Sequence, residues 1–383
     1  MSLILDFRYL MLRRRLFDDF IYIHYDGYSL KHVTRLSRKM LDNERLLNDV
    51  GVSPFECGST SMPPIPKGGL LVRVACAGAC FAEGQVKKRD IRPQLPGLEI
   101  AGYVQDVCSS LPNKNFTQGD KVILYPDEGV LSTGCAEYLA VSDVSNCIQI
   151  PPSIPLEVAA QLSGSALTAY CALIKAKSHV EKLREVKSCV NVMIIGAGGL
   201  GLWAVKIAQA LVGPTDNGVR VYVADHSIDR LLAAQDHGCY DIIHWNEEDH
   251  EQYIVERTLD ACRGGVDVIV DFVSSPRTVQ RDLKVLNREG LILVGGNTLS
   301  EVSINLNVLA AKQQSIAGIP QGTFEQLQQI IDMVADKKVE PPMYQVFPAC
   351  DAHQVYQDLA QCRIVGRAIL SYMDSTQTLD NQH

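Results

Sequence analysis

A glycine-rich turn at residues 196–201 (GAGGLG) constrains this chain more than any other segment of its 383 residues. The turn directly follows an apolar run over 192–195 and is itself followed by a helical segment. In that context Gly196 permits a tight turn, Gly198 lets the backbone approach a pyrophosphate, and Gly201 allows close packing of helix and strand. The amino end of the helix then presents free N–H groups to phosphate. The segment predicts a dinucleotide-binding α/β unit.

The next apolar run, 219–224, ends in Asp225. A carboxylate at this position accepts hydrogen bonds from the adenosine ribose, and its charge repels a 2′-phosphate. Asp225 stands further from the turn than the usual ~20 residues, because the polar stretch 213–218 lengthens the intervening loop. We therefore expect NAD as the cofactor, with NADP as the less favoured alternative. An aspartate that only caps the following helix would give the same sequence pattern.

Apolar strands and helices alternate regularly in this part of the chain. Continuous apolar runs of this kind are typical of a parallel sheet that helices cover on both faces. The expected strands lie at 190–195, 219–224, 266–270 and 291–294, with helices at 200–211 and 229–236.

The segment from Gly68 onward instead contains short strands separated by glycine, proline and asparagine, which favours a small barrel or rolled sheet. The expected strands lie at 70–74, 100–104, 121–124 and 136–141, and a helix over 156–175 follows them. The last part of the chain contains a further helix at 324–335 and strands at 344–347 and 367–370.

The composition disfavours several classes of protein. A net charge of −8 does not provide the basic surface that nucleic-acid binding needs. No apolar run reaches the ~18–20 residues of a membrane-spanning helix. The twelve cysteines form no Cys-x-x-Cys pair, and we interpret them as reduced thiols. These features predict a cytoplasmic protein that binds neither nucleic acid nor membrane.

Residues 1–40 differ from the rest, with eight Lys or Arg against four Asp. A basic, amphipathic segment allows a mitochondrial presequence as the alternative, but such peptides avoid acids such as Asp6, Asp18 and Asp19. We expect residues 1–60 to form a helical or loosely ordered N-terminal extension.

Six sequence segments occur in a recognisable order. They are VACAGAC at 74–80, LPGLEIAG at 95–102, GDKV at 119–122, AEY at 136–138, the glycine-rich turn, and VGRAIL at 365–370. Together they resemble the medium-chain dehydrogenase/reductase superfamily over roughly 68–371. The resemblance implies an α/β fold with a β-rich GroES-like catalytic domain and a doubly wound parallel Rossmann domain. It assigns residues 61–165 and 340–383 to the first domain and residues 166–339 to the second.

Zinc alcohol dehydrogenases of this superfamily hold a catalytic zinc with a cysteine, a histidine and a third ligand, usually cysteine. Cys80 matches the first ligand, but Leu98 stands in place of the histidine and Ser165 in place of the third ligand. Zinc needs about three N, S or O ligands from the protein. Cys80 and Glu99 alone would bind it poorly.

Two further elements of the zinc enzymes are missing. Ala82 and Gln85 stand where a hydroxyl and a histidine would pass on the alcohol proton, and the four-cysteine lobe for structural zinc retains only Cys135. We therefore expect no zinc, and a zinc-type alcohol dehydrogenase is the least favoured alternative.

The resemblance also implies the residues that contact the cofactor. Arg230 would lie along the adenosine, and Arg367 would reach the pyrophosphate as a charge-assisted donor. A solvated surface charge is the alternative interpretation of either arginine. The full expected set is Gly196, Gly198, Gly199, Leu200, Gly201, Asp225, Arg230, Phe272, Val273, Val294, Gly295 and Arg367.

Hydride transfer without zinc requires a substrate that is already electrophilic, as quinones and enones are. The zinc-independent quinone oxidoreductases and enoyl reductases of the superfamily resemble this case. Thr168 and Tyr170, on the helix that the family places beside the nicotinamide, are the candidate proton donors, although Tyr170 fits a packing role better. A cofactor-binding protein without turnover, acting as a sensor or structural protein, is the main alternative.

The assembly expected from the resemblance is a homodimer. Members of the superfamily often pair their Rossmann sheets edge to edge. The segment 291–294, followed by 302–304, offers apolar strand material that would otherwise leave an adhesive edge.

Overall fold

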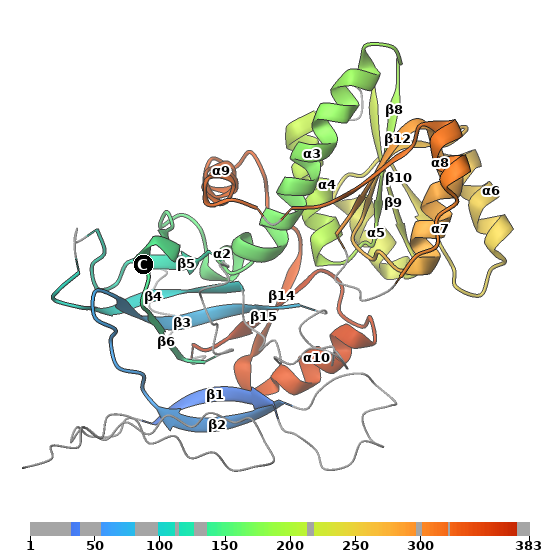
Figure 1. Ribbon diagram of the computed structural model, residues 1–383. Coiled ribbons are helices and arrows are strands. Elements are labelled where there is room, and N and C mark those ends of the chain that lie inside the picture. The colour runs from blue at the N-terminus through green and yellow to red at the C-terminus, as the bar shows by residue number, and fades with distance from the viewer. Residues whose placement is uncertain are drawn as a thin grey trace, which may run out of the picture. The chain divides into compact units, whose positions relative to one another are not determined.

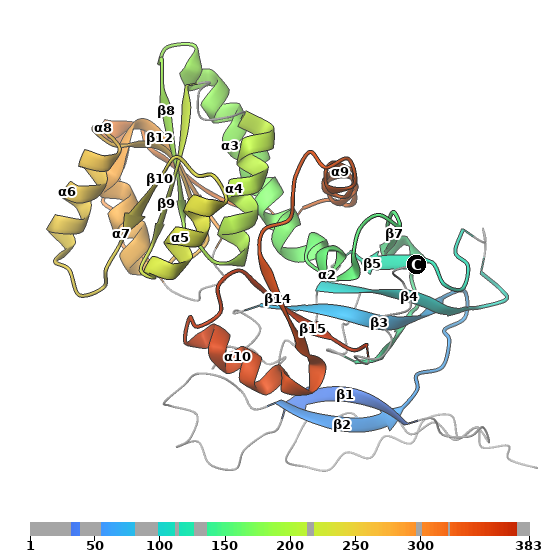
Figure 2. The same ribbon diagram turned by 180° about the vertical axis from the view of Figure 1, so that it is seen from behind.

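The computed structural model describes residues 32–38, 55–80, 99–111, 115–125, 136–212, 218–295, 301–320 and 322–373. Its two larger sheets contain six and seven strands (Figure 1, with the reverse view in Figure 2). Within the described ranges no helix is both long and apolar enough to cross a membrane.

The six-stranded sheet is parallel throughout and has the order β10-β9-β8-β11-β12-β13. The chain winds outward from β8 to β10, then crosses to the other side of β8 and winds outward to β13. The crevice between β8 and β11, where the winding reverses, is where such sheets bind ligands. The strands are β8 (Val190–Ile195), β9 (Val219–Asp225), β10 (Asp241–His244), β11 (Val266–Asp271), β12 (Leu286–Val294) and β13 (Ser315–Gly318).

Consecutive strand residues point to opposite faces of this sheet, and both sets are apolar. Helices therefore cover both faces. Val192 and Ile194 belong to one core with residues of α3 and α4, whereas Met193 and Ile195 belong to another with residues of α6 and α7. The two helical layers lie on either side of the strands in Figure 1. The helices are α3 (Leu167–Arg184), α4 (Gly199–Val212), α5 (Ile228–Asp236), α6 (Glu251–Ala261), α7 (Pro276–Val285) and α8 (Leu306–Lys312).

The seven-stranded sheet is mainly antiparallel, with the order β14-β15-β3-β4-β5-β7 and β6 paired to β3. Its core includes Leu70, Val72, Ile100 and Val122. The strands are β3 (Leu70–Ala79), β4 (Glu99–Val107), β5 (Lys121–Leu124), β6 (Tyr138–Val141), β7 (Cys147–Gln149), β14 (Tyr344–Pro348) and β15 (Arg367–Ser371). In the sequence, α9 (Phe324–Ala335) precedes β14, and α10 (Ala352–Ala360) connects β14 to β15.

The chain therefore returns to its first sheet after completing the second. β15 pairs antiparallel with β3 and parallel with β14. The two sheets confirm the predicted combination of a β-rich domain with a doubly wound parallel sheet.

The predicted helical segment over 156–175 is mostly helical, but it is not one continuous α-helix. The segment contains α2 (Leu156–Ala159), a π-helical turn η2 (Leu162–Ala166) and then α3. The Ser165 N–H donates to Glu99 Oε1 at 2.5 Å, and the Ala166 N–H donates to the carbonyl of Gln161, five residues back. A carboxylate from β4 thus takes one N–H out of the helical ladder and widens the turn.

Two other expectations need correction. β1 (His32–Arg38) pairs antiparallel with β2 (Phe55–Ser61), so these parts of the N-terminal region are strands rather than a helical or loose extension. Residues 1–31 and 39–54 lie outside the described residues. Residues 302–304 form no strand, and β13 is the outermost strand on that side of the parallel sheet.

Candidate functional site

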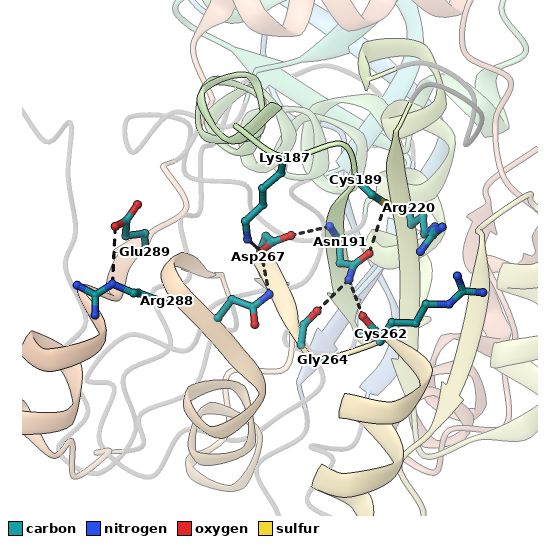
Figure 3. Close-up of a pocket in the computed structure, with 12 residues that line it drawn as sticks. Lys187, Cys189, Asn191, Arg220, Cys262, Gly264, Asp267, Arg288 and Glu289 are labelled. Carbon is teal, nitrogen blue, oxygen red and sulfur yellow. Dashed lines mark hydrogen bonds and ion pairs between the residues drawn. The ribbon is translucent and has the colours of Figure 1, made fainter. Parts of the chain in front are cut away.

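A cavity of about 560 Å³ lies at the amino-terminal ends of β8 and β11 (Figure 3). The buried Asp267 accepts hydrogen bonds there from Lys187 Nζ at 2.6 Å, the Asn191 N–H at 2.9 Å and Asn287 Nδ2 at 2.9 Å. These contacts join the starts of neighbouring strands. The polar groups of the cavity therefore have a structural role there. Ligands of doubly wound sheets bind at the opposite edge, beyond the carboxyl ends of the strands.

The carboxyl edge of the parallel sheet brings the expected cofactor residues together. Asp271, the last residue of β11, pairs with Ile195 on β8 and with Val294 on β12, and Ile195 pairs with Ala224 on β9. Four strands therefore end at one level. The segments that directly follow or form these ends are the turn 196–201, Asp225, Phe272–Val273 and Val294–Gly295.

The glycine-rich turn has the geometry that its sequence predicts. Gly196 has a φ of +95°, a left-handed conformation that favours glycine. A side chain at Gly201 would overlap the carbonyl oxygen of Gly196, so close packing requires glycine there. A Cβ atom at Gly198 would meet nothing within 4 Å, which leaves its backbone open to a ligand. Leu200 is half-buried in the first turn of α4.

Asp225 connects the end of β9 to this turn. Its carboxylate is 7% exposed and accepts hydrogen bonds from the Ala197 N–H at 2.7 Å and the Ser227 N–H at 2.8 Å. A carboxylate offers about four acceptor sites, so capacity for ribose hydroxyls remains. The capping alternative does not hold, because the N-cap residue of α5 is Ser227, whose hydroxyl accepts from the Arg230 N–H.

Polar groups from distant parts of the sequence surround Asp225. Arg230 is partly buried, and its Nη2 donates to the carbonyl of Ile364 at 3.3 Å, which argues against a purely solvated charge. His226 Nδ1 lies 3.5 Å from Asp225 Oδ1. A hydrogen bond between His226 and Cys362 raises the pKa of the imidazole and lowers the pKa of the thiol. Neither residue could be predicted from the sequence, because no local pattern relates position 226 to position 362.

Arg367 lies directly against the glycine-rich turn. Its side chain occupies the space that a Cβ atom at Gly199 would need. The residue is 4% exposed and forms an ion pair with Glu99, which is equally buried. The interpretation of Arg367 as a solvated surface charge is therefore wrong.

Ser165, at one of the zinc positions of the family, and Glu99, beside another, are hydrogen-bonded to other groups of the protein. Glu99 directs one carboxylate oxygen to the Ser165 N–H and the other to Arg367. The Ser165 hydroxyl donates to the carbonyl of Gln161 at 3.1 Å, and a Cβ atom at Gly164 would overlap the Glu99 carboxylate. Among the residues that the structure describes, no three His, Cys, Asp or Glu side chains could hold a metal. Residues Ala82, Gln85, Leu98 and Cys135 lie outside the described ranges.

The loop after β11 packs against the glycine-rich turn. The Phe272 N–H donates to the carbonyl of Ile195 at 3.1 Å, and the Val273 side chain lies 3.1 Å from the Cβ position of Gly196. On β12, the Val294 carbonyl accepts from the Ile319 N–H at 2.8 Å, and the Ile319 side chain covers the Cβ position of Gly295. Val273 remains 43% exposed at this edge, where a ligand can reach it.

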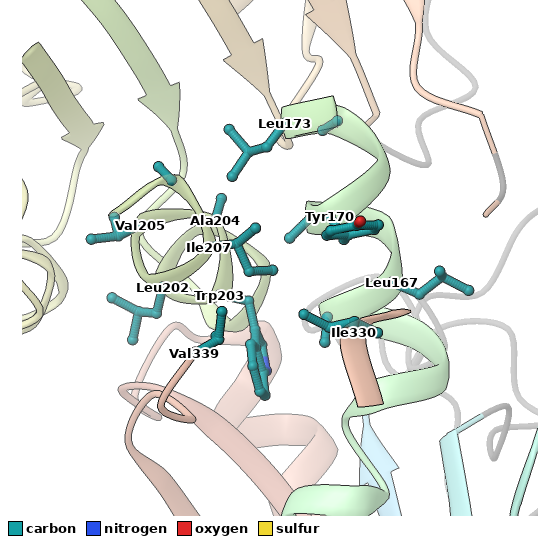
Figure 4. Packing of buried hydrophobic residues seen from close by; sticks show 14 of the residues in the cluster. Leu167, Tyr170, Leu173, Leu202, Trp203, Ala204, Val205, Ile207, Ile330 and Val339 are labelled. Atoms are coloured by element: carbon teal, nitrogen blue, oxygen red, sulfur yellow. The ribbon is translucent and has the colours of Figure 1, made fainter. Parts of the chain in front are cut away.

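Tyr170 is placed for packing. It is 5% exposed, and its hydroxyl donates to Gln329 Oε1 on α9 at 2.9 Å. Figure 4 shows its ring in the hydrophobic cluster that also contains Trp203 on α4 and Ile330 on α9. Thr168 is half-buried and lies two residues before Tyr170 on α3. Ser163, on the π-helical turn, has a buried hydroxyl with no hydrogen-bond partner in the described part of the chain.

Two protein-family models match the chain: "Zinc-binding dehydrogenase" over 199–336 and "Alcohol dehydrogenase GroES-like domain" over 66–180. An NAD-dependent alcohol dehydrogenase of Sulfolobus acidocaldarius is 26% identical over 363 residues, covering 85% of this chain and 98% of its own. Quinone oxidoreductase-like protein 2 of Bos taurus is 24% identical over 330 residues, covering 80% of this chain and 86% of its own.

A similar fold occurs in the crystal structure of the alcohol dehydrogenase from Aeropyrum pernix. It matches with a TM-score of 0.73 at 22% identity, and the match covers 88% of this chain and 99% of that one.

Proposed function

The chain belongs to the medium-chain dehydrogenase/reductase superfamily, and from this premise we propose that it is a zinc-independent, NAD(H)-dependent oxidoreductase. Its substrate would be a small electrophilic molecule such as a quinone or an enone. The observation that supports the proposal is the engagement of Ser165, at the third-ligand position. Its N–H donates to Glu99, which also pairs with Arg367, and its hydroxyl donates to the Gln161 carbonyl.

The carboxyl edge of the parallel sheet supplies the cofactor site of this proposal. NAD(H), when bound, supplies or accepts the hydride. Gly198 leaves space for the pyrophosphate, and the amino end of α4 stabilises its charge. Asp225 accepts from the ribose hydroxyls, and Arg230 flanks the adenosine. The nicotinamide side is formed by Phe272–Val273 and Val294–Gly295. The Arg367 side chain packs against Gly199 and borders the glycine-rich turn.

The chemistry follows from the groups that remain without zinc. A zinc-independent site has no Lewis acid to polarise a carbonyl or stabilise an alkoxide, so an unactivated alcohol would react poorly there. A quinone or enone accepts a hydride because its own π system stabilises the resulting charge. Orientation and exclusion of water then provide most of the catalysis. Thr168 is the proton donor that we propose, because the Tyr170 hydroxyl is engaged with Gln329.

A protein that binds the cofactor without turnover is the second candidate function. The buried and hydrogen-bonded Tyr170 favours it, since one of the two candidate proton donors is committed to packing.

We predict NADH oxidation with quinones or enones, unaffected by a chelator, and no NAD⁺ reduction with simple alcohols. A spectrophotometric panel of these substrates at steady state checks the activity. The control is Gly201→Val, whose side chain would overlap the Gly196 carbonyl and disrupt the turn. Tight NADH binding by the wild type without turnover of any substrate would favour the non-catalytic candidate. Alcohol oxidation lost on chelation would contradict the zinc-independent assignment.

We predict that NADH binds more tightly than NADPH and that Asp225→Ser reduces or inverts this preference. The substitution removes charged hydrogen bonds worth about 1.5–3 kcal/mol each and relieves repulsion of the 2′-phosphate. The ratio of affinities should therefore shift on the order of tenfold to a few hundredfold. Fluorescence titration of both reduced cofactors measures it. Asp229→Ser, at an exposed position on α5, is the matched control. An unchanged ratio in Asp225→Ser would refute NAD selection by Asp225.

We propose that the protein is a homodimer that associates through β13. This short outermost strand is only partly buried, and Leu306 on the preceding α8 is 72% exposed. An edge strand of this kind can pair with its own copy across a twofold axis. Light scattering at micromolar concentration should give twice the chain mass of 42.2 kDa. A mass of one chain at that concentration would rule the dimer out.

A further inference from the structure

Asp282 is a carboxyl group deep inside the parallel-sheet domain. It lies on α7, is 0% exposed, and neither of its oxygens has a donor from another described residue. The carboxyl group within hydrogen-bonding reach is that of Asp271 at the end of β11, which is also 0% exposed. A hydrogen bond between two carboxyl groups needs a proton on one of them. An ionised carboxylate without a donor in such a place would be very costly.

The surroundings identify which carboxyl group is ionised. Asp271 accepts from the N–H groups of Val273 at 2.8 Å and Ser274 at 2.7 Å, and from the Thr278 hydroxyl at 2.8 Å. Burial raises the pKa of Asp271, but these three donors act in the opposite direction and favour its charged form. Asp282, one helical turn beyond Thr278, has no such donor, so it carries the proton and donates to Asp271.

We propose that Asp282 and Asp271 form a carboxylic acid–carboxylate pair that positions the loop 272–275 against the glycine-rich turn. Asp282 is then a positioning residue for cofactor binding, acting through Asp271. This inference rests on the proposed function, because it takes the carboxyl edge of the sheet as the cofactor site.

The loop needs such a support. Ser274 has a φ of +48°, a left-handed conformation that is unfavourable for a residue with a side chain. Asp271 fixes it by accepting from the Val273 and Ser274 N–H groups, while the Ser274 hydroxyl donates to the Asp271 carbonyl at 2.8 Å. The Val273 side chain then lies 3.1 Å from the Cβ position of Gly196. Asp282 is thus connected to the turn through two intermediate residues.

Few other charges face the pair. Burial, and then the charge of Asp271, raise the pKa of Asp282. The opposing charge is Arg281, which is engaged in two hydrogen bonds with Glu251 on α6 at 2.7 and 2.8 Å. On β12, residues 288–289 are exposed and form a loose ion pair with each other. The folded chain therefore keeps the Asp282 proton to a higher pH than an exposed aspartate would, because burial and the neighbouring Asp271 raise its pKa.

The first experiment tests the shared proton through stability. The unfolded chain releases the Asp282 proton above about pH 4, whereas the folded chain keeps it up to its raised pKa. Wild-type stability should therefore fall with rising pH relative to Asp282→Asn, by up to about tenfold in the folding equilibrium constant per pH unit. Denaturant unfolding from pH 5 to 8 measures this. Asp260→Asn, exposed on α6, is the control and should run parallel to the wild type. If the stabilities of the wild type and Asp282→Asn change with pH in the same way, Asp282 is not protonated in the folded chain and the inference fails.

The second experiment tests positioning with two probes, NADH and AMP. Asp282→Asn still donates to Asp271 and should bind NADH within about twofold of wild type at pH 7. Asp282→Leu leaves Asp271 without that donor and should bind NADH about tenfold more weakly, while AMP, which meets only the Asp225 side, binds as before. Asp282→Ala replaces the leucine variant if the latter does not fold.

The outcomes separate this inference from the proposed function. If the wild type binds neither NADH nor AMP, the proposed cofactor site fails. If the wild type binds both and Asp282→Leu or Asp282→Ala binds NADH unchanged, the positioning role fails. An equal loss of NADH and AMP affinity would also overturn it, since it would indicate a general structural role.

Discussion

The carboxylate of Glu99 joins three parts of the chain on which the site depends. It begins β4, accepts the Ser165 N–H from the π-helical turn, and pairs with Arg367 at the start of β15. Both charged residues are 4% exposed, and removing one partner of a buried pair costs about 3–5 kcal/mol. Because the Arg367 side chain lies on Gly199, the same ion pair also fixes one wall of the glycine-rich turn. The β-rich domain and the dinucleotide turn are therefore coupled through two side chains.

The same contacts limit the chemistry. A backbone N–H and a guanidinium hold the Glu99 carboxylate, and one carboxylate falls short of the roughly three protein ligands that zinc needs. Position 164 is glycine, and any side chain there would occupy the space of Glu99. The family relationship shows a dehydrogenase fold, and its relatives include a protein named for alcohols and one named for quinones. Our proposal of an electrophilic substrate takes the arrangement around Glu99 as its support.

The parts of the fold that could be predicted are those with a local signal. The turn 196–201 can be recognised from a sequence pattern shorter than ten residues. The same is true of the apolar runs that form β8, β9 and β11. Asp225 could be placed from its position at the end of the apolar run that follows the turn, whereas Arg367 could be placed only through the resemblance to a family. The ion pair of Arg367 with Glu99 joins residues 268 apart, and no pattern in the sequence relates them. The π-helical turn was missed for the same reason, since a distant carboxylate causes it. Asp282 reads as an ordinary polar helix residue until its burial is known.

We propose that Glu99 and its partners take the place of a zinc site, and the zinc content of the protein tests this proposal directly. Protein expressed in zinc-supplemented medium, purified without chelator and dialysed, should contain well under one zinc per chain by elemental analysis. One zinc per chain that survives dialysis would contradict the account and would require ligands near Cys80 and Glu99 that the described contacts do not provide.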